Sequence, residues 1–315
     1  MAAMLRRDFL AGIAAAPLFA QNGNSPVRRI DRNRLSAITD EIAFNREEAM
    51  AFTRHYKLHC IELRDVPGAK RHYESLSEQE LKEAAKEFQE NGVKVTFFNT
   101  PYFKFPLPGT EPVRRRTETP EAREKRLARD KAFFETRAED VRRGARAAQM
   151  LGADKMRVFT FSRVAEPESV MQRVAEILGE MALVAGKEGV KMLIENEASC
   201  NVATSAELAG IMKLIPSKNV GMNWDSENGM AFKETVFPDG YNTLPKDRLW
   251  NVQAKGHTLL DPAHKLDWAA IFSALERDGY SGAVGLETHY FDGTNLEKSH
   301  MAMEEMIRIA ESSRT

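Results

Sequence analysis

Short apolar runs that each end in a polar residue recur in the second half of the chain. Four of them are Lys191–Glu197, Val220–Asp225, Leu249–Lys255 and Gly282–Glu287. Each run is short enough for a single strand, and none shows the strict apolar–polar alternation of a half-solvated strand. The pattern therefore predicts four buried parallel strands.

The polar groups at the ends of these runs are almost evenly spaced. Glu195, Asp225, Gln253 and Glu287 follow one another at intervals of 30, 28 and 34 residues. One strand, one helix and two loops need about that length. Because a closed barrel of parallel strands gathers their carboxyl ends at one mouth, we expect these four groups to converge there.

The rest of the chain shows the same succession of strand and helix patterns. Strands are predicted at 35–39, 59–64, 93–98 and 155–161. Helices are predicted at 45–56, 77–90, 120–151, 167–188 and 295–312. Eight strand–helix units without a break in composition predict one (β/α)8 TIM barrel domain over residues 35–312. An open doubly wound sheet is the alternative, but no G-x-G-x-x-G follows the first strand.

The N-terminus follows a different pattern. Arg6 and Arg7 precede Asp8, Phe9, Leu10 and a small apolar run, and this string resembles a twin-arginine export signal. The apolar run is too short to serve as a stable membrane anchor. We therefore expect a cleavable signal peptide over 1–20, a linker over 21–34, and export of the protein to the periplasm.

Composition and charge narrow the choice of partner. The 315-residue chain is 43% hydrophobic and 29% charged, with a formal net charge of −1, an ordinary mixture for a globular protein. This balance argues against general binding of nucleic acid or membrane surfaces. A small molecule is the expected partner, and the sequence leaves open whether the chain forms a homo-oligomer.

The predicted mouth gathers three carboxylates and one amide, and carboxylates without a counter-charge repel one another. A divalent cation held by Glu195, Asp225, Gln253 and Glu287 is the simplest counter-charge. Glu195 and Glu287 are also candidates for catalysis, since two carboxylates on different sides of a substrate carbon can remove and return a proton. The metal would polarise the adjacent carbonyl and stabilise an enediolate.

Further polar residues at predicted strand ends are candidates for substrate contact. They are Glu62, Lys104, Lys255, His257 and His289. His257 is also an alternative to Gln253 as the fourth ligand, because imidazole binds these metals more strongly than an amide does. The structural alternatives are a salt bridge with a neighbouring charge for the carboxylates and Lys255, and a helix N-cap for Asp225.

Several strings together resemble the xylose isomerase-like barrel family of sugar isomerases and epimerases. They are SAITDEIA (36–43), CIELR (60–64), LIENE (193–197), NWDSENG (223–229), VQAKG (252–256) and DGYSGAVGLETHY (278–290). The resemblance implies one Mn²⁺, Mg²⁺, Co²⁺ or Zn²⁺ held by Glu, Asp, His and Glu, at positions 195, 225, 253 and 287. Here Gln253 and Asn228 replace two histidines of the family pattern. The remaining oxygen-only set favours Mn²⁺ or Mg²⁺.

These residues support three hypotheses on function. The first is a metal-dependent sugar isomerase or epimerase that transfers a proton next to a carbonyl. The second, which the resemblance also implies, is a metal-dependent lyase or hydratase of 3-keto-glycosides. The third is a non-catalytic periplasmic sugar-binding barrel, which the absence of histidine at position 253 supports. All three take a sugar or a glycoside as the partner, and the sequence favours the first.

Overall fold

The computed structural model describes residues 29–113 and 117–312. The predicted export signal and most of the predicted linker lie outside the described residues. Eight parallel strands form one nearly closed barrel, and these strands are β1 (Leu35–Ala37), β2 (Cys60–Leu63), β3 (Lys94–Phe98), β4 (Lys155–Val158), β5 (Lys191–Glu195), β6 (Val220–Asp225), β7 (Leu249–Lys255) and β8 (Val284–Glu287). The predicted (β/α)8 TIM barrel is confirmed.

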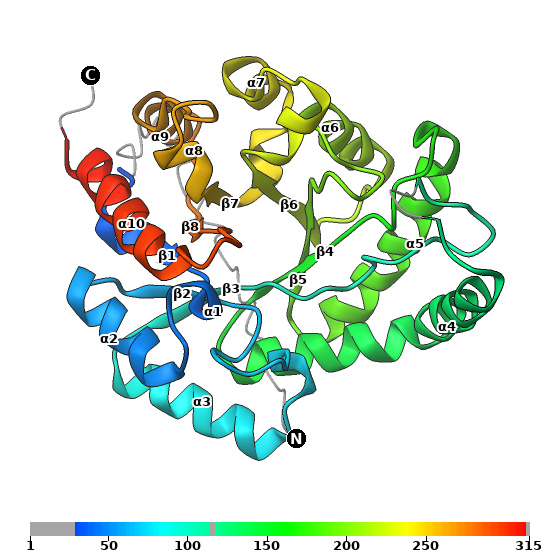
Figure 1. The fold of residues 1–315 in the computed structure, drawn as a ribbon, viewed down its shortest axis with the longest axis horizontal. Coiled ribbons are helices and arrows are strands. Elements are labelled where there is room, and N and C mark those ends of the chain that lie inside the picture. Colours follow the sequence, from blue (N-terminus) through cyan, green and yellow to red (C-terminus); the bar gives the residue numbers. More distant parts are fainter. Residues whose placement is uncertain (1–28, 114–116, 313–315) are drawn as a thin grey trace, which may run out of the picture.

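Helices connect the strands and surround them (Figure 1). Their bounds are α1 (Thr39–Ile42), α2 (Arg46–Tyr56), α3 (Glu78–Glu90), α4 (Pro120–Met150), α5 (Glu168–Lys187), α6 (Ser205–Leu214), α7 (Tyr241–Thr243), α8 (Gly256–Leu260), α9 (Trp268–Arg277) and α10 (Asn295–Glu311). Among the described residues, none of the helices combines the length and apolar character needed to cross a membrane.

The strand order closes the barrel between the first and second strands. The order is β1-β8-β7-β6-β5-β4-β3-β2, so β1 pairs along its length with β8. Strands β1 and β2 are joined by one isolated bridge, between Ile38 and Glu62. This arrangement brings the ends of β5 to β8 to one mouth together with the end of β2.

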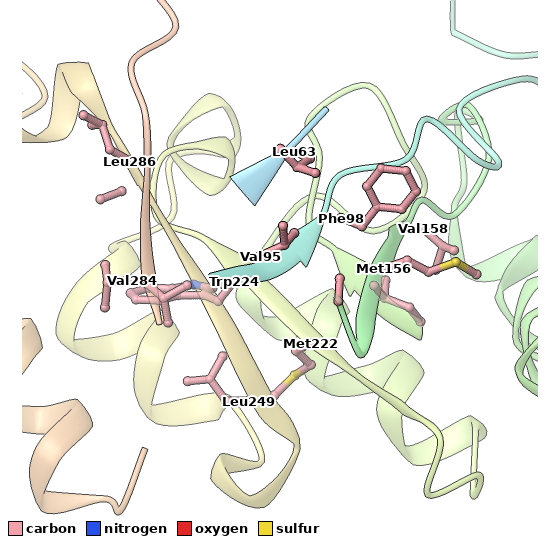
Figure 2. Packing of buried hydrophobic residues seen from close by; sticks show 14 of the residues in the cluster. Leu63, Val95, Phe98, Met156, Val158, Met222, Trp224, Leu249, Val284 and Leu286 are labelled. Carbon is pink, nitrogen blue, oxygen red and sulfur yellow. The ribbon is translucent and has the colours of Figure 1, made fainter. Parts of the chain in front are cut away.

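The main apolar core lies between the strands and the helices. Residues such as Val252 and Ala254 of β7 belong to the same buried cluster as Trp268 and Ile271 of α9. Figure 2 shows several strand residues of this core, with Trp224 among them. Because successive side chains on a strand point to opposite faces, the residues between these core positions point into the barrel.

Helix α3 begins with a capping box. Ser77 is the N-cap and accepts a hydrogen bond from the backbone N–H of Glu80, whose side chain accepts in return from the N–H of Ser77. We expect Ser77→Ala to lower the free energy of unfolding by about 1 kcal/mol, because it leaves an N–H of the first turn without its acceptor. Chemical denaturation measures the change, with Gln79→Ala in the same turn as the control. Equal losses in the two variants would contradict a capping effect.

Candidate active site

Three buried carboxylates meet at the mouth of the barrel. Glu195, Asp225 and Glu287 end strands β5, β6 and β8, and each offers one oxygen that lies within 4.8 Å of the others. Their exposed fractions are 1%, 0% and 3%. Carboxylates so close together and so buried need positive charge nearby, and the structure supplies it from three basic side chains.

Lys255 ends β7 and lies between two of these carboxylates. Its Nζ is 3.2 Å from Asp225 Oδ2 and 2.9 Å from Glu287 Oε2, and the residue is only 5% exposed. Burial acts to lower the pKa of Lys255, but Asp225 and Glu287 outweigh it and raise that pKa. Lys255 therefore stays protonated at any working pH and contributes one fixed positive charge to the cluster.

Glu195 lies against Arg157 of β4 and Asn223 of β6. Nη1 of Arg157 is 3.3 Å from both carboxylate oxygens of Glu195, and the amide of Asn223 donates to Oε2. Burial raises the pKa of Glu195 to about 7, against the opposing effect of Arg157. A carboxyl group whose pKa lies near neutrality can both take up and release a proton during a reaction.

Glu287 lies in a more positive environment. Its Oε1 is 3.2 Å from Arg64 Nη1 and 3.4 Å from His289 Nδ1, while its Oε2 contacts Lys255. Burial acts to raise the pKa of Glu287, but Lys255 and Arg64 outweigh it and lower that pKa. Glu287 is therefore an ionised carboxylate when Glu195 is close to half protonated at neutral pH.

Glu41 of α1 holds the other side of His289. The backbone N–H of His289 donates to Glu41 Oε2 at 2.7 Å, and His289 Nδ1 is 3.3 Å from Glu41 Oε1. Glu41, Glu287 and His289 form a second group with ligand atoms within 4.8 Å of one another. Arg64 also binds Glu41 and Asp40, at 2.9 and 2.7 Å. Because this guanidinium already supplies a positive charge to Glu41 and Glu287, we regard the group as support for His289.

Three buried oxygens on the neighbouring strands β6, β7 and β8 suit a hard divalent cation. Asp225 Oδ2, Gln253 Oε1 and Glu287 Oε2 are buried and have no hydrogen-bond partner within the described part of the chain. Two of them, on Asp225 and Glu287, lie within ion-pair distance of Lys255 Nζ. The third, Gln253 Oε1, belongs to a neutral amide. Oxygen donors of this kind are the ligands that Mg²⁺ and Mn²⁺ prefer. The residues present therefore fit the metal that the sequence predicts.

The structure places the predicted substrate contacts in different surroundings. Lys104 is 43% exposed at its side chain and lies 2.8 Å from Glu197. His257 is the second residue of α8, and its ring packs against Tyr290, with Nδ1 3.3 Å from Glu227 Oε1. The ring of His257 thus faces these neighbours rather than the three carboxylates.

Glu62, His289 and Asn228 lie at three different positions in the barrel. Glu62 of β2 is fully buried inside the barrel. His289 is at the mouth, 36% exposed at its side chain. Asn228, which stands at one of the family's histidine positions, donates its amide to the backbone carbonyl of Asn196 at 3.0 Å. The structure thus brings Glu195, Asp225, Glu287, Lys255 and His289 together at the mouth.

The sequence patterns did not single out several residues that hold the site. Arg157, Arg64, Glu41, Asn223 and Asn251 all contact a predicted site residue directly or through one amide. For Arg157, Asn223 and Asn251 the signal was a polar residue that interrupts an otherwise apolar strand, as in the MRV of β4 and the GMNWD of β6. Arg64 follows β2 and Glu41 lies in α1. Whether such a strand residue points into the barrel can be deduced only when the strand register is known.

The buried Glu195 should make the metal-free protein less stable as the pH rises. Because its folded pKa of about 7 exceeds the ordinary value of 4.5, the folded state binds this proton more tightly than the unfolded state does. The stabilisation is complete below the ordinary pKa and is lost as the pH rises through the folded one. The shift corresponds to about 3 kcal/mol. The melting temperature in EDTA should therefore fall more between about pH 5 and about pH 8 for the wild type than for Glu195→Gln. An equal fall in the two proteins would contradict this role of Glu195.

Comparison with known protein families agrees with the geometry. The profile of the xylose isomerase-like TIM barrel family matches residues 50–311. The chain belongs to this family. A comparison with curated protein sequences finds no match.

Solved structures of similar fold include enzymes that act on sugars. The 3-keto-D-glucoside 4-epimerase of E. coli is 15% identical with a TM-score of 0.63, over 89% of this chain and 99% of that chain. An L-ribulose 3-epimerase is 18% identical with a TM-score of 0.63, over 87% and 92%. The IOLI protein with a bound zinc atom is 16% identical with a TM-score of 0.62, over 88% and 98%. At these identities the similarity establishes the fold.

Proposed function

We propose that this protein is a metal-dependent sugar isomerase or epimerase that transfers a proton at a carbon next to a carbonyl. The observation that carries the proposal is the group of three buried carboxylates at the mouth, with the ammonium of Lys255 between two of them. Gln253, paired in register with Asp225 on the neighbouring strand, adds a buried oxygen that has no hydrogen-bond partner among the described residues. Stability alone does not require such a group, because buried charges cost free energy. The printed activities of two similar structures, both epimerases of sugars, support the same class.

Glu195, Asp225, Gln253 and Glu287 are the residues that would hold the metal. Bound there, a divalent cation would polarise the substrate carbonyl and stabilise the negative charge that develops on its oxygen. The oxygen-only donor set favours Mn²⁺ or Mg²⁺ over Zn²⁺.

The chain's own residues divide the remaining work. Glu195 and Glu287 would remove and return the proton, since their environments shift the two pKa values in opposite directions. Arg157 keeps the carboxylate of Glu195 in place from the β4 side. Lys255 would donate to a substrate oxygen, and His289 at the open side would contact a hydroxyl. Lys104 and His257, further out, would contact more distant parts of a larger substrate.

A lyase or hydratase acting on 3-keto-glycosides is the second candidate. His289 favours it, because a half-exposed imidazole held by Glu41 beside Glu287 is suitably placed to protonate a leaving group. The reaction would begin with the same proton abstraction and would end with loss of the aglycone. We propose the periplasm as the location of either activity, on the basis of the twin-arginine-like string at Arg6 and Arg7.

Isotope exchange in D₂O tests the proposal. The protein is stripped with EDTA, reloaded with Mn²⁺, and incubated with a panel of ketoses and 3-keto-glycosides while NMR follows each carbon. We expect metal-dependent deuterium incorporation next to the carbonyl and conversion to an epimer or isomer. Asp225→Asn, which removes a ligand without touching either proposed base, should lose metal and exchange together.

Each other outcome contradicts the proposal in its own way. Release of a free aglycone would select the lyase or hydratase. Tight sugar binding without exchange would select the non-catalytic sugar-binding barrel. A protein that takes up no metal from excess Mn²⁺, measured by mass spectrometry, would show that Lys255, Arg157 and Arg64 balance the carboxylates without a metal.

A further inference from the structure

We infer that Glu62 is a positioning residue that makes Gln253 an oxygen ligand of the metal site. The inference rests on the proposed function, because it concerns the same four ligands. It goes beyond that function by assigning a task to a carboxylate that lies deeper in the barrel. It also explains how a glutamine can stand where the family pattern has a histidine.

Glu62 is a fully buried carboxylate surrounded by hydrogen-bond donors. Its Oε1 accepts from Ser36 Oγ at 3.0 Å and from Asn251 Nδ2 at 3.3 Å. Its Oε2 accepts from Gln253 Nε2 at 2.6 Å and from Asn99 Nδ2 at 3.1 Å. Strand β7 contacts β2 here although β8 and β1 separate them in the sheet, so these bonds cross the barrel interior.

The contact with Glu62 decides which end of the Gln253 amide faces which way. A side-chain amide has an NH₂ donor at one end and an oxygen acceptor at the other, and an ionised carboxylate only accepts. In the structure the NH₂ group donates to Glu62, and because Ser36, Asn99 and Asn251 also donate to this carboxyl group, the amide oxygen of Gln253 faces away from it. That oxygen, Gln253 Oε1, is buried and has no hydrogen-bond partner among the described residues. Leaving it so is costly unless something binds it.

The reverse orientation of the amide would not serve a cation. If Gln253 were rotated, its NH₂ group would point toward the metal site and its oxygen toward Glu62. Two oxygens would then repel each other inside the barrel, and an NH₂ group cannot ligate a metal. Glu62 therefore fixes the orientation in which Gln253 can bind a cation.

A second line of hydrogen bonds joins Glu62 to Glu195. Asn251 Nδ2 contacts Glu62 Oε1 and also donates to Asn223 Oδ1 at 3.0 Å. Asn223 Nδ2 in turn donates to Glu195 Oε2. All four residues are buried in the barrel. Two of the four proposed ligands are thus oriented by one connected network.

Gly285 of β8 provides the space that Glu62 occupies. A Cβ at position 285 would lie 2.1 Å from Glu62 Oε1, so any side chain there would displace the carboxylate. The register pairs Gly285 with Gln253 on one side and with Ser36 on the other. The glycine thus leaves room for the carboxylate beside the amide that it orients.

The affinity for Mn²⁺ in the absence of substrate tests the inference. Isothermal titration calorimetry of the EDTA-stripped full chain is compared for the wild type, Glu62→Gln and Ser36→Ala. We expect Glu62→Gln to bind Mn²⁺ about 10–100-fold more weakly. The NH₂ group of the new side chain would face other donors, and the Gln253 amide would then be free to turn. Ser36→Ala removes a donor from the same carboxylate without touching Gln253, and it should bind like the wild type.

A double variant shows whether Glu62 acts through Gln253. Adding Glu62→Gln to Gln253→Met should weaken Mn²⁺ binding much less than adding it to the wild type. Equal losses in both backgrounds, or wild-type affinity in a folded Glu62→Gln, would overturn the inference. Circular dichroism and thermal unfolding in EDTA establish folding. If Glu62→Gln does not fold, Glu62→Asp, which shortens the carboxylate away from Gln253, replaces it with the same expectation.

The experiment separates this inference from the proposed function. If the wild type itself does not bind Mn²⁺, or if Glu195→Gln binds as tightly as the wild type, the proposed metal site is wrong. If Glu195→Gln weakens Mn²⁺ binding but Glu62→Gln binds Mn²⁺ as tightly as the wild type, only the role of Glu62 is wrong.

Discussion

The substitution Glu195→Gln should lower the rate of proton exchange by about 10³-fold or more when one of the two substrate epimers is used. The amide keeps the shape of the side chain but cannot accept a proton at neutral pH. It also leaves the buried Arg157 without its carboxylate partner at 3.3 Å. Because Glu287 remains, exchange with the other epimer should continue at a measurable rate.

Glu287→Gln is the matched variant, and it should show the opposite preference. Deuterium incorporation from D₂O, followed separately from each epimer at saturating Mn²⁺, measures both variants. Metal content measured on the same samples distinguishes loss of a base from loss of a ligand. If both variants lose exchange with both epimers equally while retaining metal, the two carboxylates do not act as separate bases. If neither variant loses exchange, the proposed site is wrong.

Exchange of Lys255 for methionine should destabilise the metal-free protein by about 3–5 kcal/mol. Methionine has a similar length, but it leaves Asp225 and Glu287 buried beside each other without the ammonium that contacts both. In a domain of this size the melting temperature should fall on the order of 10 °C. Thermal unfolding in EDTA measures the change.

The same variant should respond more strongly to metal than the wild type does. Without the ammonium, a divalent cation no longer competes with Lys255 for Asp225 and Glu287, so saturating Mn²⁺ should restore most of the lost stability. Lys265→Met is the control, because Lys265 pairs with Glu305 while 53% exposed, and such a pair contributes only about 0–1 kcal/mol. A Lys255→Met protein as stable as this control in EDTA would contradict the role given to Lys255.

The arrangement of strands could be read from the sequence because buried parallel strands leave a strong signal. The four runs from Lys191 to Glu287 appear in the structure as β5 to β8, and the helices predicted at 45–56 and 77–90 appear as α2 and α3. The spacing of the polar strand ends was enough to predict that Glu195, Asp225 and Glu287 converge. Each of these features depends on residues close together in the chain or on a regular period.

The interior of the barrel could not be read in the same way. Glu62 and Asn251 are 189 residues apart in the sequence, yet they share a hydrogen bond across the barrel. Whether a polar residue in a strand points inward, and at which depth, depends on the register between strands. For the same reason Glu62, expected to contact substrate, lies below the mouth.

The turn after β7 explains the position of His257. Gly256 begins α8 directly after the strand, so the chain changes direction before His257. The spacing of four residues after Gln253 therefore did not bring the imidazole toward the carboxylates.

The pairing of β1 with β8 determines when the sheet can be completed during synthesis. Leu35 is paired with Val284, its partner 249 residues later in the chain. At about 5–20 residues per second, the ribosome needs tens of seconds to produce that partner. Until then β1 presents unpaired N–H and C=O groups, which favour association with other chains. The first strand made is thus the last to gain its main partner, and the nascent chain needs protection at its N-terminal edge.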